Sequence, residues 1–69
     1  MKYADIKDKG GSKFRFIKDL NNGLVIPYMV VNTGASSNCF HTIINLHNGI
    51  IATFGPEESL ANDEIVLLV

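Results

Sequence analysis

The sequence has one cysteine, Cys39, and no tryptophan. A single thiol excludes an intramolecular disulfide, and no Cys/His spacing is typical of structural zinc. No apolar run approaches the length of a transmembrane helix, and the first residues lack the apolar core of a signal peptide. We therefore expect a cytoplasmic protein that does not use a membrane, a metal or another cofactor.

Basic residues are absent after position 18. All six lie within the first 18 residues: Lys2, Lys7, Lys9, Lys13, Arg15 and Lys18. Residues 1–18 also contain two acids, so this segment has a net charge of +4. Residues 19–69 contain the other five acids and have a net charge of −5. An anion held by side-chain charge must therefore contact the first segment. Basic residues confined to this segment can make few contacts with a phosphate backbone, which argues against general nucleic-acid binding.

The chain is short and apolar, with 69 residues of which 46% are hydrophobic. We expect a single domain over residues 1–69, near the lower size limit for an independent core, which buries only about 60% of its unfolded surface. Without disulfides, a chain of this kind usually completes its burial against a copy of itself. We predict a homo-oligomer in which residues 24–31 and 65–69 meet across the interface.

The strongest structural signal is Asn48-Gly49, which stands between two β-rich runs. Asn-Gly is typical of a two-residue type I′ turn, and such a turn sets the register of a hairpin. The predicted register places His47 opposite Ile50, Ile44 opposite Thr53 and Ile43 opposite Phe54. One face then carries Ile43, Ala52 and Phe54, and the other carries Ile44, Leu46 and Ile51.

Three further strands are predicted around this hairpin. Residues 13–18 alternate, with Phe14 and Phe16 inward. After a turn at 19–23, a second strand covers 24–31, at a sheet edge or bulged at Pro27. The last strand covers 64–69, and one short helical turn at 56–59 precedes it. Residues 1–9 are expected to form either one loose helical turn or an extended lead-in, anchored by Tyr3 and Ile6. The expected fold is all-β, a strongly bent five-stranded sheet or a small barrel.

The best candidate for a ligand loop is the polar segment 32–38. Its small residues let backbone N–H groups approach a ligand, and its hydroxyls add donors for phosphate oxygens. The Gly-Lys-Ser/Thr ending of a Walker loop is missing. The same composition also suits an ordinary connector. The candidate residues are Thr33, Gly34, Ser36 and Ser37.

Four more residues are candidates for a nucleotide site. Arg15, the only arginine, and Lys13 share one strand face and suit phosphate recognition. Tyr28 and His47 are candidates for stacking on a base. Each also has an ordinary interpretation, as a basic surface strand, a core tyrosine or a polar hairpin end.

No catalytic group can be assembled from the sequence. Cys39 and His41 are two residues apart, but no orienting acid or oxyanion hole accompanies them, and a buried thiol is the better explanation of Cys39. His41 and His47 are about 20 Å apart at strand rise, too far to share a metal. We predict that the protein is not an enzyme.

The order of short motifs resembles that of small bacteriophage proteins with Src-homology-3-like barrels. The matching pieces are Asp5-Ile6-Lys7, Phe14-Arg15-Phe16, Tyr28-Met29-Val30, Ile44-Asn45-Leu46 with Gly49, Phe54-Gly55-Pro56-Glu57 and residues 65–69. The chain departs from the pattern in its Gly10-Gly11-Ser12 insertion and its longer loop at 32–38.

This resemblance implies a phage product that acts by binding in the cytoplasm of an infected bacterial host. Some proteins of this kind are oligomeric sponges that sequester the cyclic nucleotide signals of antiphage defence, and others bind host proteins. Two functions therefore remain open. One is capture of a cyclic nucleotide messenger, and the alternative is a protein-interaction module that inhibits a host protein.

Overall fold

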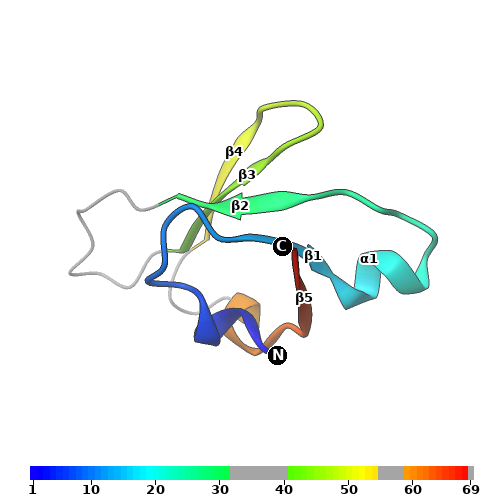
Figure 1. Cartoon of the computed structure of the whole chain (residues 1–69), viewed down its shortest axis with the longest axis horizontal. Coiled ribbons are helices and arrows are strands. Elements are labelled where there is room, and N and C mark those ends of the chain that lie inside the picture. The colour runs from blue at the N-terminus through cyan, green and yellow to red at the C-terminus, as the bar shows by residue number, and fades with distance from the viewer. Residues whose placement is uncertain (32–40, 55–58, 69) are drawn as a thin grey trace.

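Five short strands form one antiparallel sheet in the computed structural model, which describes residues 1–31, 41–54 and 59–68 (Figure 1). The strands are β1 (Lys13–Phe16), β2 (Tyr28–Val30), β3 (His41–Asn45), β4 (Ile51–Phe54) and β5 (Ile65–Leu68). The helical elements are η1 (Tyr3–Asp5), α1 (Ile17–Asn21) and η2 (Ser59–Asn62). No described helix is long and apolar enough to cross a membrane. The predicted all-β class, with one short helical turn before the last strand, is confirmed.

The strand order is β4-β3-β2-β1-β5, so β4 and β5 are the two edges of the sheet. In Figure 1 the β3–β4 hairpin rises away from β5 at the other edge. The pairing among the described residues is therefore that of a bent, open sheet, one of the two predicted forms.

One face of the sheet carries the core. Along β1, Phe14 and Phe16 are buried whereas Lys13 is exposed, as the alternation predicted. The two short 3-10 helices pack on each other and cover the same face, and the predicted anchors Tyr3 and Ile6 are only 0% and 3% exposed. The buried core consists of Tyr3, Ile6, Phe14, Phe16, Val30, Ile43, Leu60 and Ile65.

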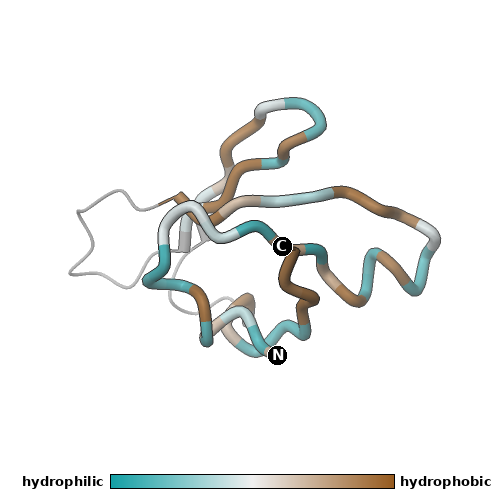
Figure 2. The backbone as a smooth tube through the Cα atoms, in the orientation of Figure 1, coloured by the Kyte–Doolittle hydropathy of each residue, from teal (hydrophilic) through white to brown (hydrophobic). Residues whose placement is uncertain are grey.

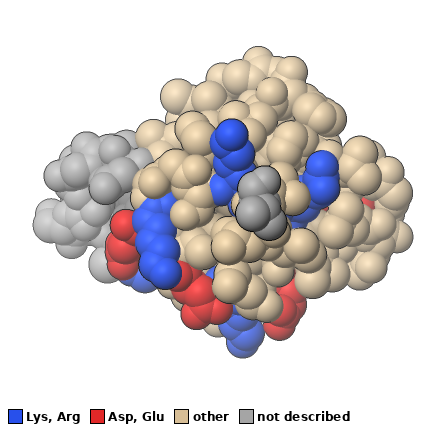
Figure 3. All heavy atoms as spheres, viewed as in Figure 1, with Lys and Arg blue, Asp and Glu red and all other residues tan. Residues whose placement is uncertain are grey.

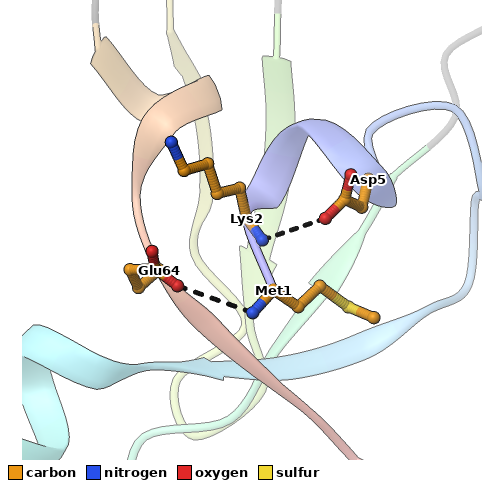
Figure 4. Close-up of polar contacts among 4 residues, drawn as sticks. All are labelled: Met1, Lys2, Asp5 and Glu64. Atoms are coloured by element: carbon orange, nitrogen blue, oxygen red, sulfur yellow. Dashed lines mark hydrogen bonds and ion pairs between the residues drawn. The ribbon is translucent and has the colours of Figure 1, made fainter.

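The first residues are held against the start of β5 (Figure 4). The Met1 carbonyl accepts a hydrogen bond from Ile65 N at 2.7 Å, and Tyr3 N donates to the Asp63 carbonyl at 2.9 Å. The Met1 amino group lies 3.5 Å from Glu64 Oε2. This short antiparallel pairing fixes η1 where the Tyr3 ring fills the core beneath Phe14, with ring centroids 5.4 Å apart.

The predicted strand over 13–18 and turn over 19–23 are both corrected. The strand ends at Phe16, and residues 17–21 form the helix α1. Gly23, with φ of 79°, donates its N–H to Leu20 O, and Leu24 N donates to Asp19 O. These two bonds and the left-handed glycine form a Schellman motif, so Asn22-Gly23 ends a helix and not a hairpin.

The second strand is shorter than predicted. Only residues 28–30 of the expected 24–31 belong to β2. Pro27 has no N–H to give to the ladder, and its carbonyl accepts from Leu46 N at 2.9 Å just outside the strand. Leu24 and Val25 lie before it and are 47% and 58% exposed.

The predicted hairpin register is wrong by two residues. Ile44 lies opposite Ile51, and Ile43 lies opposite Ala52. Asn45 causes the shift, because its Oδ1 accepts from the backbone N–H groups of residues 47 and 48 and its carbonyl accepts from residue 49. These bonds stabilise a four-residue loop over 46–49 in place of a two-residue turn. A shift of two preserves strand parity, so the predicted face assignments of Ile43, Ala52, Ile44 and Ile51 stand.

Candidate functional site

An open pocket of about 300 Å³ lies between α1, β2 and the β3–β4 hairpin. Its volume is at the lower end of the range typical of small-molecule sites. It is lined by Phe16, Lys18, Asp19, Tyr28, Ile43, Asn45, Asn48, Ile50 and Ala52.

The floor of the pocket is aromatic and apolar. Tyr28 lies opposite Phe14 in the β1–β2 ladder, which places its ring on the core side of the sheet. The Tyr28 ring contacts Phe16 edge-on, with centroids 5.1 Å apart and planes at 66°. The Phe14 ring contacts both of these rings and fixes their positions, so the pocket has a preformed aromatic surface.

Lys18 and Asp19, in the first turn of α1, place charge at the rim. Lys18 Nζ lies 5.0 Å from the centroid of the Phe16 ring and 3.2 Å from Asp63 Oδ2. Asp19 Oδ2 is buried and accepts no hydrogen bond from any described residue. A buried carboxylate oxygen without a donor is costly, so a ligand N–H group placed there would be stabilising.

The Tyr28 hydroxyl is a donor at neutral pH. Burial raises the pKa of Tyr28, the Asp19 carboxylate raises it further, and Lys18 opposes the shift. The hydroxyl therefore stays protonated through the physiological range.

Two asparagines complete the rim from the hairpin. Asn45 Oδ1 accepts from the backbone of its own loop, and Asn48 Oδ1 accepts from Ile50 N at 2.9 Å. Their Nδ2 groups make no hydrogen bond to the described residues and are available to a ligand. The rim thus combines several donors with one strong acceptor around an apolar floor.

The residues that the sequence predicted to form one nucleotide site lie in different parts of the structure. Tyr28 lines the pocket. Lys13 and Arg15 flank Phe14 along β1 and therefore lie on the opposite face of the sheet, so they cannot share this pocket with Tyr28. His47 is exposed in the hairpin loop beside Asn48 and is not among the lining residues. Thr33, Gly34, Ser36 and Ser37 lie outside the described residues, and their role stays a prediction.

Sequence reasoning missed Lys18, Asp19, Asn45 and Asn48. Asn45 carried a usable signal, because an asparagine at the end of a β-rich run commonly bonds the backbone of the following turn. Lys18 and Asp19 carried none, since their approach to the hairpin depends on the helix that replaced the predicted turn.

A comparison of the chain with protein-family models, with curated proteins and with solved structures finds no match. Within the described residues, no group of three His, Cys, Asp or Glu side chains is placed to hold a metal ion.

Proposed function

We propose that the protein binds a nucleotide without catalysis and holds the base in the pocket lined by Tyr28 and Phe16. The supporting observation is an aromatic floor beneath a buried carboxylate oxygen of Asp19 that has no donor among the described residues. In this proposal the protein is the cyclic nucleotide sponge that the resemblance implies, and it acts by sequestration.

The chemistry of the rim favours guanine among the bases. Stacking of a base on an aromatic side chain contributes about 1–3 kcal/mol and tolerates any base. The hydrogen-bonding edge of guanine places an imino N–H beside an amino group, which is the donor pair that a carboxylate accepts best. Adenine and cytosine offer an amino group beside a ring acceptor, and that acceptor would be repelled by Asp19.

The phosphates belong outside the pocket. Asp19 repels them at the rim, and the single ammonium of Lys18 is already shared with Asp63. Lys13 and Arg15 are on the other face of the sheet. The proposed phosphate contacts are therefore the hydroxyls and N–H groups of Thr33, Gly34, Ser36 and Ser37, as predicted from the sequence.

Calorimetric titration with cyclic di-GMP, cyclic di-AMP and cyclic mono- and dinucleotides of uridine tests the proposal. We expect the guanine nucleotide to bind most tightly and Asp19→Asn to weaken it by about tenfold or more, since a hydrogen bond to a charged group contributes about 1.5–3 kcal/mol. Asp8→Asn is the matched control, because Asp8 is exposed, pairs with Lys7 and does not line the pocket.

Two results would contradict the proposal. Failure of every nucleotide to bind the wild-type chain, or equal binding by Asp19→Asn, removes the pocket as the site. Chromatographic recovery of the nucleotide after incubation tests whether binding occurs without catalysis. Conversion of the nucleotide to a product would show that the protein is an enzyme.

A further inference from the structure

The face of the sheet opposite the core is unusually apolar for a surface. The registers align one residue from each strand in a single row, in the order Ile51, Ile44, Met29, Lys13 and Leu68. Four of these five are apolar, and Ile51 is 58% exposed. With strands about 4.8 Å apart, the row is roughly 19 Å long. We call these five residues, with Arg15 and its neighbour Val66, the outer face.

Two basic residues lie in β1, next to the β5 edge of the outer face. Lys13 stands between Met29 and Leu68, and Arg15 lies opposite Val66, which is 42% exposed. Arg15 is half-buried, and its Nε is a buried donor without an acceptor among the described residues. A carboxylate or a phosphate is the partner that best fits the donors of a guanidinium.

No acid of the sheet neutralises this pair, because none of the five strands contains Asp or Glu. The acid next along the chain, Glu64, lies two residues before Val66 and pairs with the Met1 amino group. In the view of Figure 3, blue side chains stand within a tan surface that continues over the β3–β4 hairpin, and most of the red lies at the left and in the lower part. Among the described residues the two cations have no acidic neighbour in the sheet, so a partner with negative charge would complement the outer face.

The same charges decide between possible occupants. A second copy stacked symmetrically on this face would oppose like charges across the two-fold axis, with no strand acid to pair them. Nucleic acid would cover four apolar side chains with a phosphate backbone, whereas its usual interfaces are polar and strongly basic. A protein segment that carries an acidic residue between apolar ones matches both the apolar row and its basic pair.

We infer that the outer face docks an acidic, apolar segment of another protein. Its carboxylate pairs with Arg15 and Lys13, and its apolar side chains cover Met29, Ile44 and Ile51 on one side and Val66 and Leu68 on the other. An extended segment of about six residues crosses a row of this length. The site lies on the opposite face from the nucleotide pocket and does not depend on it.

Selection of a displayed random-peptide library on the full wild-type chain tests this inference, followed by fluorescence anisotropy with the recovered peptide. We expect enriched peptides that combine Asp or Glu with apolar residues, and perturbed backbone amides along the outer face in nuclear magnetic resonance spectra. Lys13→Glu should weaken binding by about tenfold or more, since close like charges repel. Lys9→Glu makes the same charge change at an exposed position outside the strands and should bind as wild type.

A second pair of neighbouring variants separates the two faces. Ile51→Asn should weaken binding of the peptide and leave any binding of a nucleotide unchanged. Ile50 is 64% exposed and lines the pocket, so Ile50→Asn should weaken binding of a nucleotide and leave binding of the peptide unchanged. Both positions are exposed, so both variants should fold, and Lys13→Glu carries the test if one does not.

Several outcomes would overturn the inference. These are a selection that yields no peptide, enriched peptides without acids, or equal losses in Lys9→Glu and Lys13→Glu. Binding to phosphatidylserine vesicles that competes with the peptide would assign the face to a membrane. Self-association that Ile51→Asn abolishes would assign it to a second copy.

Discussion

Phe14 and Tyr28 lie directly opposite each other in the β1–β2 ladder, and their rings stack with centroids 5.8 Å apart and planes at 25°. Because side chains alternate along a strand, this pairing places Tyr28 on the core side and the neighbours of Phe14 on the other. Residues that together suggested one nucleotide site therefore belong to two surfaces. The nucleotide pocket and the outer face can be tested separately for this reason.

Replacing the Tyr28 ring should remove most of the stacking surface of the pocket. We expect Tyr28→Leu to weaken nucleotide binding by about ten- to a hundredfold, since base stacking contributes about 1–3 kcal/mol. Tyr28→Phe keeps the ring and should lose little. Calorimetry measures both affinities, and equal affinities for the two variants would place the base elsewhere.

Alkaline pH should destabilise the fold through Tyr3. Burial raises the pKa of Tyr3 to about 12, and the nearby Asp8 carboxylate adds to the shift. Because the unfolded chain ionises first, the stabilisation is fully present below pH 10 and is lost as the pH rises through about 12. Two units correspond to roughly 2.7 kcal/mol at most. Urea denaturation across this range measures it, with Tyr3→Phe as the comparison. A flat profile in the wild-type chain would contradict the burial of the hydroxyl.

The hairpin loop should depend on Asn45 and Gly49. Asn45→Ala removes the Oδ1 that accepts from two backbone N–H groups, which should cost about 1–2 kcal/mol of the free energy of unfolding. Gly49 has φ of 75°, and an added Cβ would meet no atom within 4 Å. Gly49→Ala should therefore cost only the backbone strain, about 1–2 kcal/mol. Chemical denaturation measures both. Asn21→Ala, at an exposed position in α1, is the control and should cost less than either.

Self-association remains a prediction, and the sheet edge at β5 is a candidate interface. Among the described strands β5 pairs with β1 alone, and its Leu67 is 44% exposed. A lysine on an edge strand disfavours pairing, so Leu67→Lys should raise the dissociation constant of the oligomer by roughly tenfold, about 1.4 kcal/mol. Val25→Lys tests the other predicted segment in the same sedimentation experiment. A wild-type chain that sediments as a monomer at every concentration would contradict the prediction for both.

Much of the fold follows from local patterns in the sequence. The alternation around Phe14 and Phe16 identified β1 and its buried side. The spacing of Tyr3 and Ile6 identified both as anchors in the core, and the structure decided for a helical turn over an extended lead-in. These predictions succeeded because the period of apolar residues is set by the geometry of the strand or helix itself. The pairs Asn22-Gly23 and Asn48-Gly49 correctly marked reversals of the chain.

Only the tertiary structure decided what kind of reversal each Asn-Gly pair makes. A glycine with positive φ serves a tight hairpin turn, a helix end or a longer loop equally well. The choice depends on which residues face each other once the strands pair, as Phe14 does with Tyr28 and Ile44 with Ile51. The pocket has the same origin, since Asp19 and Asn48 are far apart in sequence and line one pocket only because α1 and the hairpin lie on either side of it in the folded chain. Side-chain periodicity is local and can be read along the chain, whereas register is set by contacts between distant segments.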